Sequence, residues 1–369
     1  MSWTLLPASQ FADHAARWRD LNKASVNSPL LEPAFVQPLL TEFGDGGEWL
    51  AVCERGGRTV AMALLKKSQQ GAWQTFQPSQ QPLGMWLHLP DQTLPELMDS
   101  LLRSLPGMPL VLGLTQFDSW LHPRPADGAQ LRTADYISTA RITIAGTFDE
   151  YWAARGKNLR ANLKKQRAKL AKEGITARMD VLRAPADMAQ AVADYGVLES
   201  AGWKAELGTA IHPDNAQGRF YRSMLENFAQ RGEASVYRYF FDERLVAMNL
   251  CIEGGGAKIV LKTTYDESLS SQYSPAFLMR EDTCHVLFEE RLFERLEFYG
   301  KVMEWHLRWT DEVRSMYHIT HYRWPALKSL HTLVKNLKGG RAPAQPAAQP
   351  TAQPGAQPVP ARHTEPSTE

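Results

Sequence analysis

Apolar residues recur along the chain in a pattern that predicts two groups of strands. Residues 49–76 and 235–265 each contain three short apolar runs separated by tight turns, as in three antiparallel strands. Within these groups, the run VAMAL at 60–64 aligns with VAMNL at 246–250. The shared order of runs and turns predicts two related α/β halves.

Helices are predicted on both sides of the second group. Thr147 followed by Glu150 fits a capping box, and Gly174 is a natural C-cap for the helix that this box begins. Helices are expected over about 147–172, 186–200, 214–231 and 274–291, and a strand over 295–299. This order predicts an α/β (α+β) fold in which mixed sheets are flanked by helices.

The chain is expected to divide into three parts. The boundary between the halves is expected near residue 145, which gives a first domain over 1–145 and a second over 146–335. In the remaining part, 336–369, the triplet AQP recurs every four residues from 344 to 358. This part has almost no apolar bulk and many prolines, so we expect a disordered tail. A peptide-docking segment is the alternative.

Charge and cysteine content narrow the classes of function. Lys and Arg number 41 against 40 Asp and Glu, so the chain has no global attraction for nucleic acid or an anionic membrane. Cys53, Cys251 and Cys284 are far apart and form no metal-binding spacing, so no metal is expected. No stretch reaches the roughly 18 apolar residues of a membrane span, and we see no signal peptide. The expected location is a reducing compartment, most simply the cytoplasm.

Five segments follow one another through the second half. They are KNLRANLKKQRAKLAKEG (157–174), ESAGWK (199–204), DERLVAMNL (242–250), KTTYDESLSSQYSPAFLM (262–279) and EFYGKVMEWHLRWTDE (297–312). In this order and spacing, residues 151–323 resemble the acetyltransferase domain of the GNAT superfamily, in its cellulose-biosynthesis (CelD/BcsL-like) group, a relative of the Fem aminoacyl transferases. Residues 1–145 resemble the degenerate companion domain of these proteins. The resemblance implies two GNAT-like acyl-CoA N-acyltransferase halves, the second catalytic.

The helix that begins at Ser274-Pro275 is the candidate site for the donor. Serine can cap a helix, and proline at the first position lacks the N–H that would otherwise have no partner. The N–H groups of Ala276, Phe277 and Leu278, with the helix dipole, would form an anion site suited to a pyrophosphate. The alternative is an ordinary capped helix that packs its side chains into the core.

The resemblance also implies acetyl-CoA, or another acyl-CoA, as co-substrate, with its pantetheine arm in an opening of the sheet. Backbone N–H groups of the strand 258–265, including Lys262 and Thr263, would bond this arm and polarise the thioester carbonyl. The family has Ser-Pro-Gly where this chain has Ala276 in third place, and a Tyr-Lys pair where it has Trp305-His306.

Transfer to an amine requires a general base, because the attacking nitrogen must lose a proton. The candidate bases are His306, Glu304 and Glu297, and the candidate proton donors to the leaving thiolate are Tyr273 and Tyr299. The alternative is that residues 304–308 follow a strand whose polar side chains form a solvated face.

Three further residues are candidate contacts for the acceptor, namely Trp203, Lys204 and Arg308. Trp203 could instead belong to the core, and Arg308 could instead pair with Asp311 or Glu312. The helix over 155–172 carries eight basic residues and no acid. Its basic face could be merely solvated, or it could contact the 3′-phosphate of CoA, an anionic glycan or tRNA.

The sequence thus predicts an acyl-CoA-dependent N-acyltransferase, with O-acylation as a variant, acting on an amino sugar or another small polar acceptor. The resemblance alone suggests exopolysaccharide or cell-surface glycan biosynthesis, whose machinery would be the partner; nucleic acid is not expected as a partner. One alternative is a Fem-type transferase that moves an aminoacyl group from charged tRNA to a peptidoglycan precursor. The other is a non-catalytic binding domain with the tail as its tether.

Overall fold

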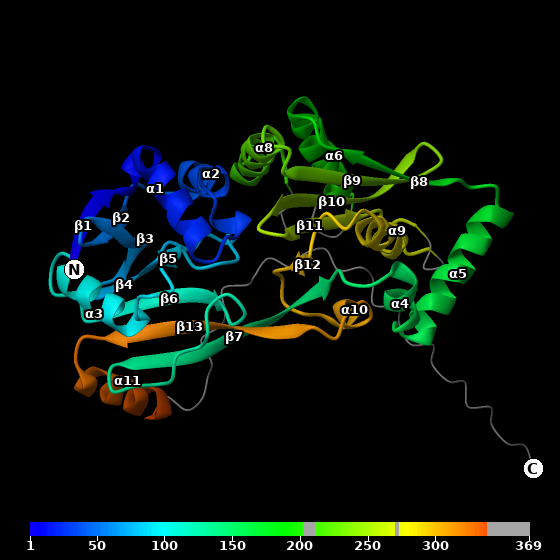
Figure 1. Cartoon of the computed structure of the whole chain (residues 1–369). Helices are drawn as coiled ribbons and strands as arrows, with labels where there is room; N and C mark the ends of the chain where they lie inside the picture. Colours follow the sequence, from blue (N-terminus) through cyan, green and yellow to red (C-terminus); the bar gives the residue numbers. More distant parts are fainter. Residues whose placement is uncertain (202–210, 270–272, 338–369) are drawn as a thin grey trace, which may run out of the picture.

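The computed structural model of the chain describes residues 1–201, 211–269 and 273–337 (Figure 1). Trp203, Lys204 and the expected tail from residue 338 onward lie outside these ranges. The first half contains β1 (Ser2–Pro7), α1 (Phe11–Ala24), α2 (Pro33–Phe43), β2 (Glu48–Arg55), β3 (Arg58–Gln69), β4 (Ala72–Thr75), β5 (Trp86–His88), α3 (Leu94–Ser104), β6 (Val111–Asp118) and β7 (Leu131–Thr143).

The second half begins with α4 (Phe148–Ala153), α5 (Lys157–Lys172), β8 (Ala177–Leu182), α6 (Met188–Ser200) and α8 (Ala216–Ala229). It continues with β9 (Ala234–Phe241), β10 (Arg244–Gly254), β11 (Ala257–Tyr265), α9 (Pro275–Glu290), β12 (Arg295–Phe298), α10 (Glu304–Leu307), β13 (Val313–Tyr322) and α11 (Pro325–Leu337). None of the helices in the described ranges has the length and apolar character that crossing a bilayer requires.

Most predicted elements are confirmed, and two are corrected. The capping box of Thr147 and Glu150 is present, and Gly174 has the positive φ of +72° expected of a C-cap. However, the helix expected over 147–172 is two helices, α4 and α5, because the chain turns at Gly156, whose dihedral angles are not helical. Residues 304–307 form the short helix α10 and not a strand, so the predicted alternation of their side chains is wrong.

The two halves repeat the same sheet topology. In the first half, β2, β3 and β4 pair antiparallel, α3 follows, and β6 returns parallel to β4. In the second half, β9, β10 and β11 pair antiparallel, α9 follows, and β12 returns parallel to β11. The internal repeat that the apolar runs predicted is therefore present as two GNAT-like units.

The halves exchange their last strands and so share one mixed sheet. β13, from the end of the second half, lies between β6 and β7 and is antiparallel to both. β7, from the end of the first half, pairs antiparallel with β12. The resulting order is β1-β2-β3-β4-β6-β13-β7-β12-β11-β10-β9-β8, with β5 beside β3 (Figure 1). The strand β12 is consequently the link between the two parts of the sheet.

Helices cover both faces of the second half of the sheet. The α6–α8 face carries residues such as Val236 and Leu250 into one core cluster, whereas α9 packs on their neighbours, such as Tyr237 and Cys251, in another (Figure 1). Because successive side chains of a strand point to opposite faces, this partition follows from strand alternation. Phe220 of α8 also packs edge-on against Phe35 of α2 at 5.4 Å between ring centroids, which joins the halves.

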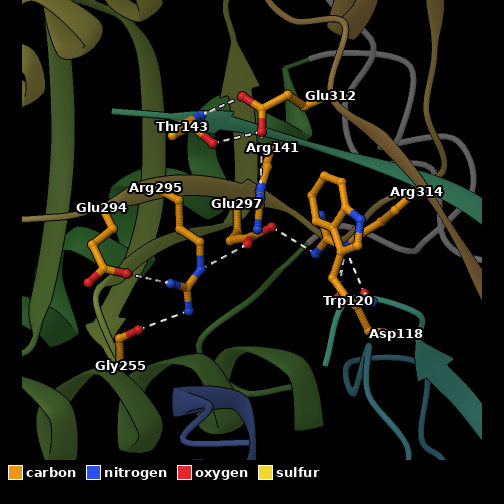
Figure 2. A network of polar contacts seen from close by, with 10 residues as sticks. All are labelled: Asp118, Trp120, Arg141, Thr143, Gly255, Glu294, Arg295, Glu297, Glu312 and Arg314. Atoms are coloured by element: carbon orange, nitrogen blue, oxygen red, sulfur yellow. Dashed lines mark hydrogen bonds and ion pairs between the residues drawn. The ribbon is translucent and has the colours of Figure 1, made fainter. Parts of the chain in front are cut away.

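A buried ionic network lies where β6, β12 and β13 meet (Figure 2). The Arg314 guanidinium donates to both carboxylate oxygens of Asp118, at 2.8 and 2.7 Å, and to Glu297 Oε2 at 2.7 Å. Arg295 contacts the other Glu297 oxygen at 3.2 Å, and the Trp120 ring lies under the Arg314 guanidinium at 4.6 Å. The network ties the exchanged strand β13 to both halves.

We expect Asp118→Ala to lower the free energy of unfolding by about 3–5 kcal/mol, because it leaves the buried Arg314 charge without one of its two carboxylates. Urea denaturation of both proteins measures this difference. Glu226→Ala, which breaks the exposed Arg222–Glu226 pair on α8, is the control and should cost no more than about 0.5 kcal/mol. Equal effects of the two substitutions would contradict a structural role for the network.

Candidate active site

The pairing between β11 and β12 covers only the first part of β11. These strands pair in parallel only from Ala257 with Arg295 to Val260 with Phe298, after which β12 ends and β11 continues to Tyr265. The β10–β11 register also shifts beside Leu261, which is the mark of a bulge. The edge of residues 261–265 that faces away from β10 therefore carries backbone groups without a strand partner in the described sheet. We call this edge of β11, beside the end of β12, the fork.

The side chains of the two predicted donor contacts on β11 are engaged on the faces of the sheet. Lys262 Nζ lies 3.4 Å from Glu199 Oε1, under α6, and the Thr263 hydroxyl donates to Asn249 Oδ1 at 2.6 Å. A ligand in the fork would therefore meet the backbone of these residues, as the resemblance implied for a pantetheine arm.

The start of α9 offers fewer free amides than predicted. The Phe277 and Leu278 N–H groups both donate to the Ser274 carbonyl, at 2.9 and 3.0 Å. Leu278 is the first residue whose N–H makes the regular α-helical bond, to the carbonyl four residues earlier, so counting it as a free donor was wrong. The Ala276 N–H is the one of the three for which the described residues provide no acceptor.

Capping of α9 also differs from the prediction. The Ser274 side chain makes no capping bond; instead, the Gln166 side chain of α5 accepts the Ser274 N–H at 2.7 Å. Ala276 and Phe277 are buried, and Phe277 packs against Trp309 at 5.8 Å between ring centroids. The exposed Arg308 guanidinium lies 5.8 Å from the Phe277 ring centroid, so a cation stands beside this helix start.

His306 lies beside the fork as a buried, neutral side chain. Its ring stacks on Trp305 and packs edge-on against Phe298, the last paired residue of β12. Burial, together with the nearby Arg280 cation, lowers the pKa of His306 to about 3. Because Nδ1 accepts the Met303 N–H at 3.0 Å, the ring proton lies on Nε2. At neutral pH, His306 is thus a hydrogen-bond donor through Nε2 and a poor base.

Glu297 belongs to the ionic network of Figure 2, and Tyr299 lies beside Arg314 of that network. Glu297 alternates with Phe298 along β12, so its carboxylate points away from the face on which Phe298 meets His306. Burial raises the pKa of Glu297 against the opposing effect of Arg314. Burial also raises the pKa of Tyr299, whose ring lies 5.1 Å from the Arg314 guanidinium. The structure does not bring either residue to the same side as His306.

Glu304 and Tyr273 lie at the periphery of the candidate site. Glu304 is exposed at the first position of α10, one turn from Arg308. The Tyr273 hydroxyl donates to Glu173, and partial burial with this bond raises the pKa of Tyr273 to about 12. Asp311 and Glu312, the expected alternatives for Arg308, pair instead with Arg155 and Arg141.

Two buried ionisable residues near the fork, Glu199 and Arg280, were not among the candidates from the sequence. Glu199, in the segment ESAGWK, is buried against Lys262 and accepts the Ile211 N–H at 2.8 Å. Arg280 of α9 is 3% exposed, and its guanidinium lies 4.6 Å from the Phe298 ring centroid. The available sequence signal was a charged residue on an otherwise apolar helix face. Arginine and glutamate are rarely buried without a partner, so such a position suggests a specific role.

A basic groove runs along α5. Its volume is about 510 Å³, and it is lined by Trp152, Lys157, Arg160, Ala161, Lys164, Arg167 and Glu281. Arg167 is neutralised by Glu281 and Asp282 of α9, at 2.6 and 2.5 Å. The other three cations give the groove a net positive charge that fits a phosphate-bearing ligand.

Residues 157–307 match the family model of the acetyltransferase (GNAT) domain. This span runs from α5 to α10 and contains the fork, the start of α9 and His306. This part of the chain is therefore similar in sequence to GNAT acetyltransferase domains. A search of curated protein sequences finds no significant match.

Solved structures share the fold of nearly the whole chain. The C-terminal domain of an Agrobacterium fabrum protein named as a lysylphosphatidylglycerol synthetase has a TM-score of 0.55 at 13% identity, over 88% of this chain and 96% of that one. FemX has a TM-score of 0.54 at 9% identity, over 91% and 100%. L-PGS from Bacillus licheniformis has a TM-score of 0.52 at 13% identity, over 88% and 97%. At these identities the likeness establishes the fold alone.

We expect His306 to make stability depend on pH. Its pKa is about 3 in the folded chain, against about 6.5 when unfolded, so the unfolded state binds more protons and stability falls as the pH falls below about 7. Relative to His306→Gln, the wild type should lose about 2 kcal/mol of unfolding free energy between about pH 7 and pH 5.

Urea denaturation at both pH values measures this loss, with His285→Gln, at a half-exposed position of α9, as the control. A wild-type-to-variant difference that stays constant over this pH range would show that His306 is not buried as a neutral ring.

Proposed function

We propose that the chain is an acyl-CoA-dependent N-acyltransferase, with acetyl-CoA as the simplest donor. The observation that carries the proposal is that the span matching the GNAT domain contains a sheet that opens between two parallel strands. Such an opening can receive an extended thiol arm, because the free strand edge supplies backbone hydrogen bonds along its length.

The donor would bind across three features of this domain. Its pantetheine arm would bond the backbone at Lys262 and Thr263, and its pyrophosphate would meet the Ala276 N–H. The Arg308 guanidinium lies 5.8 Å from the ring centroid of Phe277, the residue after Ala276, and would add positive charge near the start of α9. The thioester would then lie near Phe298, where β11 and β12 part.

Among the three candidate bases, Glu304 fits best. His306 is a donor with a pKa of about 3, and Glu297 is bound to Arg314 and Arg295. Glu304 is exposed on α10 beside His306 and would take the proton of the acceptor amine, directly or through water. The raised pKa values of Tyr273 and Tyr299 make both phenols weak acids, so the released thiolate would take its proton from solvent.

The proposed acceptor and pathway are based on the sequence resemblance. We propose an amino sugar or a similar small polar acceptor, in exopolysaccharide or cell-surface glycan biosynthesis and in the cytoplasm. Trp203 and Lys204, which follow Glu199 in the chain, remain the proposed acceptor contacts, with Arg308 serving the donor or the acceptor.

Calorimetric titration of CoA tests the proposal. We expect saturable binding that weakens at least tenfold, about 1.4 kcal/mol, in Ala276→Glu, because a carboxylate would stand beside the pyrophosphate. Ala216→Glu, at the start of α8, is the control and should leave affinity unchanged. The absence of CoA binding by the wild type, or equal binding by both variants, would count against the donor site.

A Fem-type aminoacyl transfer from charged tRNA is the second candidate, and the basic groove along α5 favours it. Three unneutralised cations, Lys157, Arg160 and Lys164, line one open surface that a nucleic-acid backbone could follow. The fold that the chain shares with FemX is compatible with this candidate.

Two double variants of equal charge separate the groove from the rest of α5. Lys157→Glu with Lys164→Glu alters the groove, whereas Lys165→Glu with Lys172→Glu alters exposed residues outside it. If tRNA binds there, the first pair should reduce its affinity at least tenfold and flatten the salt dependence, and the second should have a much smaller effect. Filter binding at several salt concentrations measures both. If neither CoA nor tRNA raises the melting temperature, a non-catalytic domain is the remaining candidate.

A further inference from the structure

Arg280 is a buried cation without a counter-ion among the residues that the structure describes. Its side chain leaves α9 toward the sheet, the residue is 3% exposed, and its Nη1 has no hydrogen-bond partner among the described residues. Burial lowers the pKa of this guanidinium below its ordinary value, although not far enough to neutralise an arginine at physiological pH. The site therefore holds a positive charge that the protein leaves uncompensated.

The groups that most affect the charge of Arg280 are neutral. Among the described residues, Cys251, Cys284, Tyr151 and Tyr237 have the largest effects on the pKa of Arg280, and Arg280 in turn lowers the pKa of His306. Burial raises the pKa values of the two thiols to about 11, keeps both phenols protonated, and lowers the pKa of His306 to about 3. None of these groups carries charge at neutral pH, so none offsets the guanidinium.

Arg314 is a second buried arginine, and its environment differs from that of Arg280. Its guanidinium binds the carboxylates of Asp118 and Glu297 at 2.7 Å. Burial alone would lower its pKa, but the two carboxylates raise it above the ordinary value. Within the described ranges, Arg280 has the face of the Phe298 ring, at 4.6 Å, and no carboxylate; an aromatic face compensates a charge less well than an anion does. The contrast indicates that the counter-charge of Arg280 comes from a bound ligand.

The position of Arg280 indicates where the negative charge on a bound ligand would lie. Phe298 is the last residue of β12 that pairs with β11, and both Arg280 and His306 contact its ring. The two side chains thus flank the point at which the strands part. His306 presents an Nε2–H donor, because its Nδ1 already accepts the Met303 N–H. A cation and a neutral donor therefore both lie against the ring of Phe298, at the closed end of the fork.

We propose that Arg280 is a catalytic residue that stabilises the oxyanion formed on the acyl carbonyl oxygen during transfer, with His306 as a second donor. This inference rests on the proposed acyl transfer. The amine nitrogen forms a bond to the thioester carbon, and the carbonyl π electrons move to the oxygen beside Arg280. When that pair returns, the carbon–sulfur bond breaks, the sulfur leaves as a thiolate, and the amine proton goes to the base.

The fold should not need this charge. Replacing a buried, unpaired cation with an apolar side chain of similar length removes a desolvation cost, whereas replacing a paired one leaves two carboxylates buried. We therefore expect Arg280→Met to melt at the same temperature as the wild type or higher, and Arg314→Met to melt at a lower one. A large loss of melting temperature in Arg280→Met would assign Arg280 a structural role and overturn the inference.

The decisive experiment compares turnover of the wild type with that of Arg280→Met, Arg280→Gln and Arg280→Lys. The assay follows thiol release from acetyl-CoA with glucosamine as the acceptor. We expect kcat to fall about 100-fold or more in the Met and Gln variants, with KM and CoA affinity within about twofold, and partial recovery in the Lys variant. This pattern belongs to a group that acts on the transition state.

Each other outcome has a definite meaning. Turnover by the wild type that survives in Arg280→Gln and Arg280→Met would overturn this inference and leave the proposed function intact. A rise in KM with unchanged kcat would show that Arg280 binds a permanent anion of a substrate, and would also overturn the inference. Wild-type protein that binds CoA but releases no thiol with any amine acceptor would overturn acyl transfer and the inference together.

Discussion

The structure depends on one short strand. The four residues of β12 pair with β11 on one side and with β7 on the other, so they join two parts of a continuous sheet. Because β12 ends at Phe298 while β11 runs on to Tyr265, the joint is also the place where the sheet opens. A longer β12 would pair with residues 261–265 of β11 and close the fork.

Charge is distributed around this strand in two ways. On one side of β12, the Glu297 carboxylate faces Arg314 and Arg295, and the ions compensate one another inside the protein. On the other side, Arg280 lies against Phe298, and no described residue supplies an anion to it. Burial makes both arrangements energetically significant, since a cation in the interior must be paired or carry a cost. The paired side serves the exchange of strands between the halves, and the unpaired side faces the point at which a thioester would lie.

Local signals in the sequence were sufficient for the elements that local interactions determine. The capping box at Thr147, the glycine cap at Gly174 and the proline at the start of α9 each act within a few residues, and the three-strand groups follow from apolar runs and turns. These signals, with the order of motifs, predicted the repeated groups of strands and the mixed sheet flanked by helices.

Long-range contacts account for what the sequence could not predict. Gln166 caps Ser274 from 108 positions away, and Arg314 finds Asp118 at a separation of 196, so neither partner is visible in a local pattern. The exchange of β7 and β13 is likewise a choice of strand partners that apolar periodicity does not encode. His306 illustrates the consequence for function: its residue type suggests a base, whereas its burial and its bond to Met303 make it a donor.

The most direct test of this account is a crystal structure of the protein with CoA. The account predicts the pantetheine arm along residues 261–265 of β11, the sulfur at the closed end of the fork beside Phe298, and the pyrophosphate at Ala276. CoA that lies wholly in the groove along α5, with side chains filling the space between β11 and β12, would contradict it.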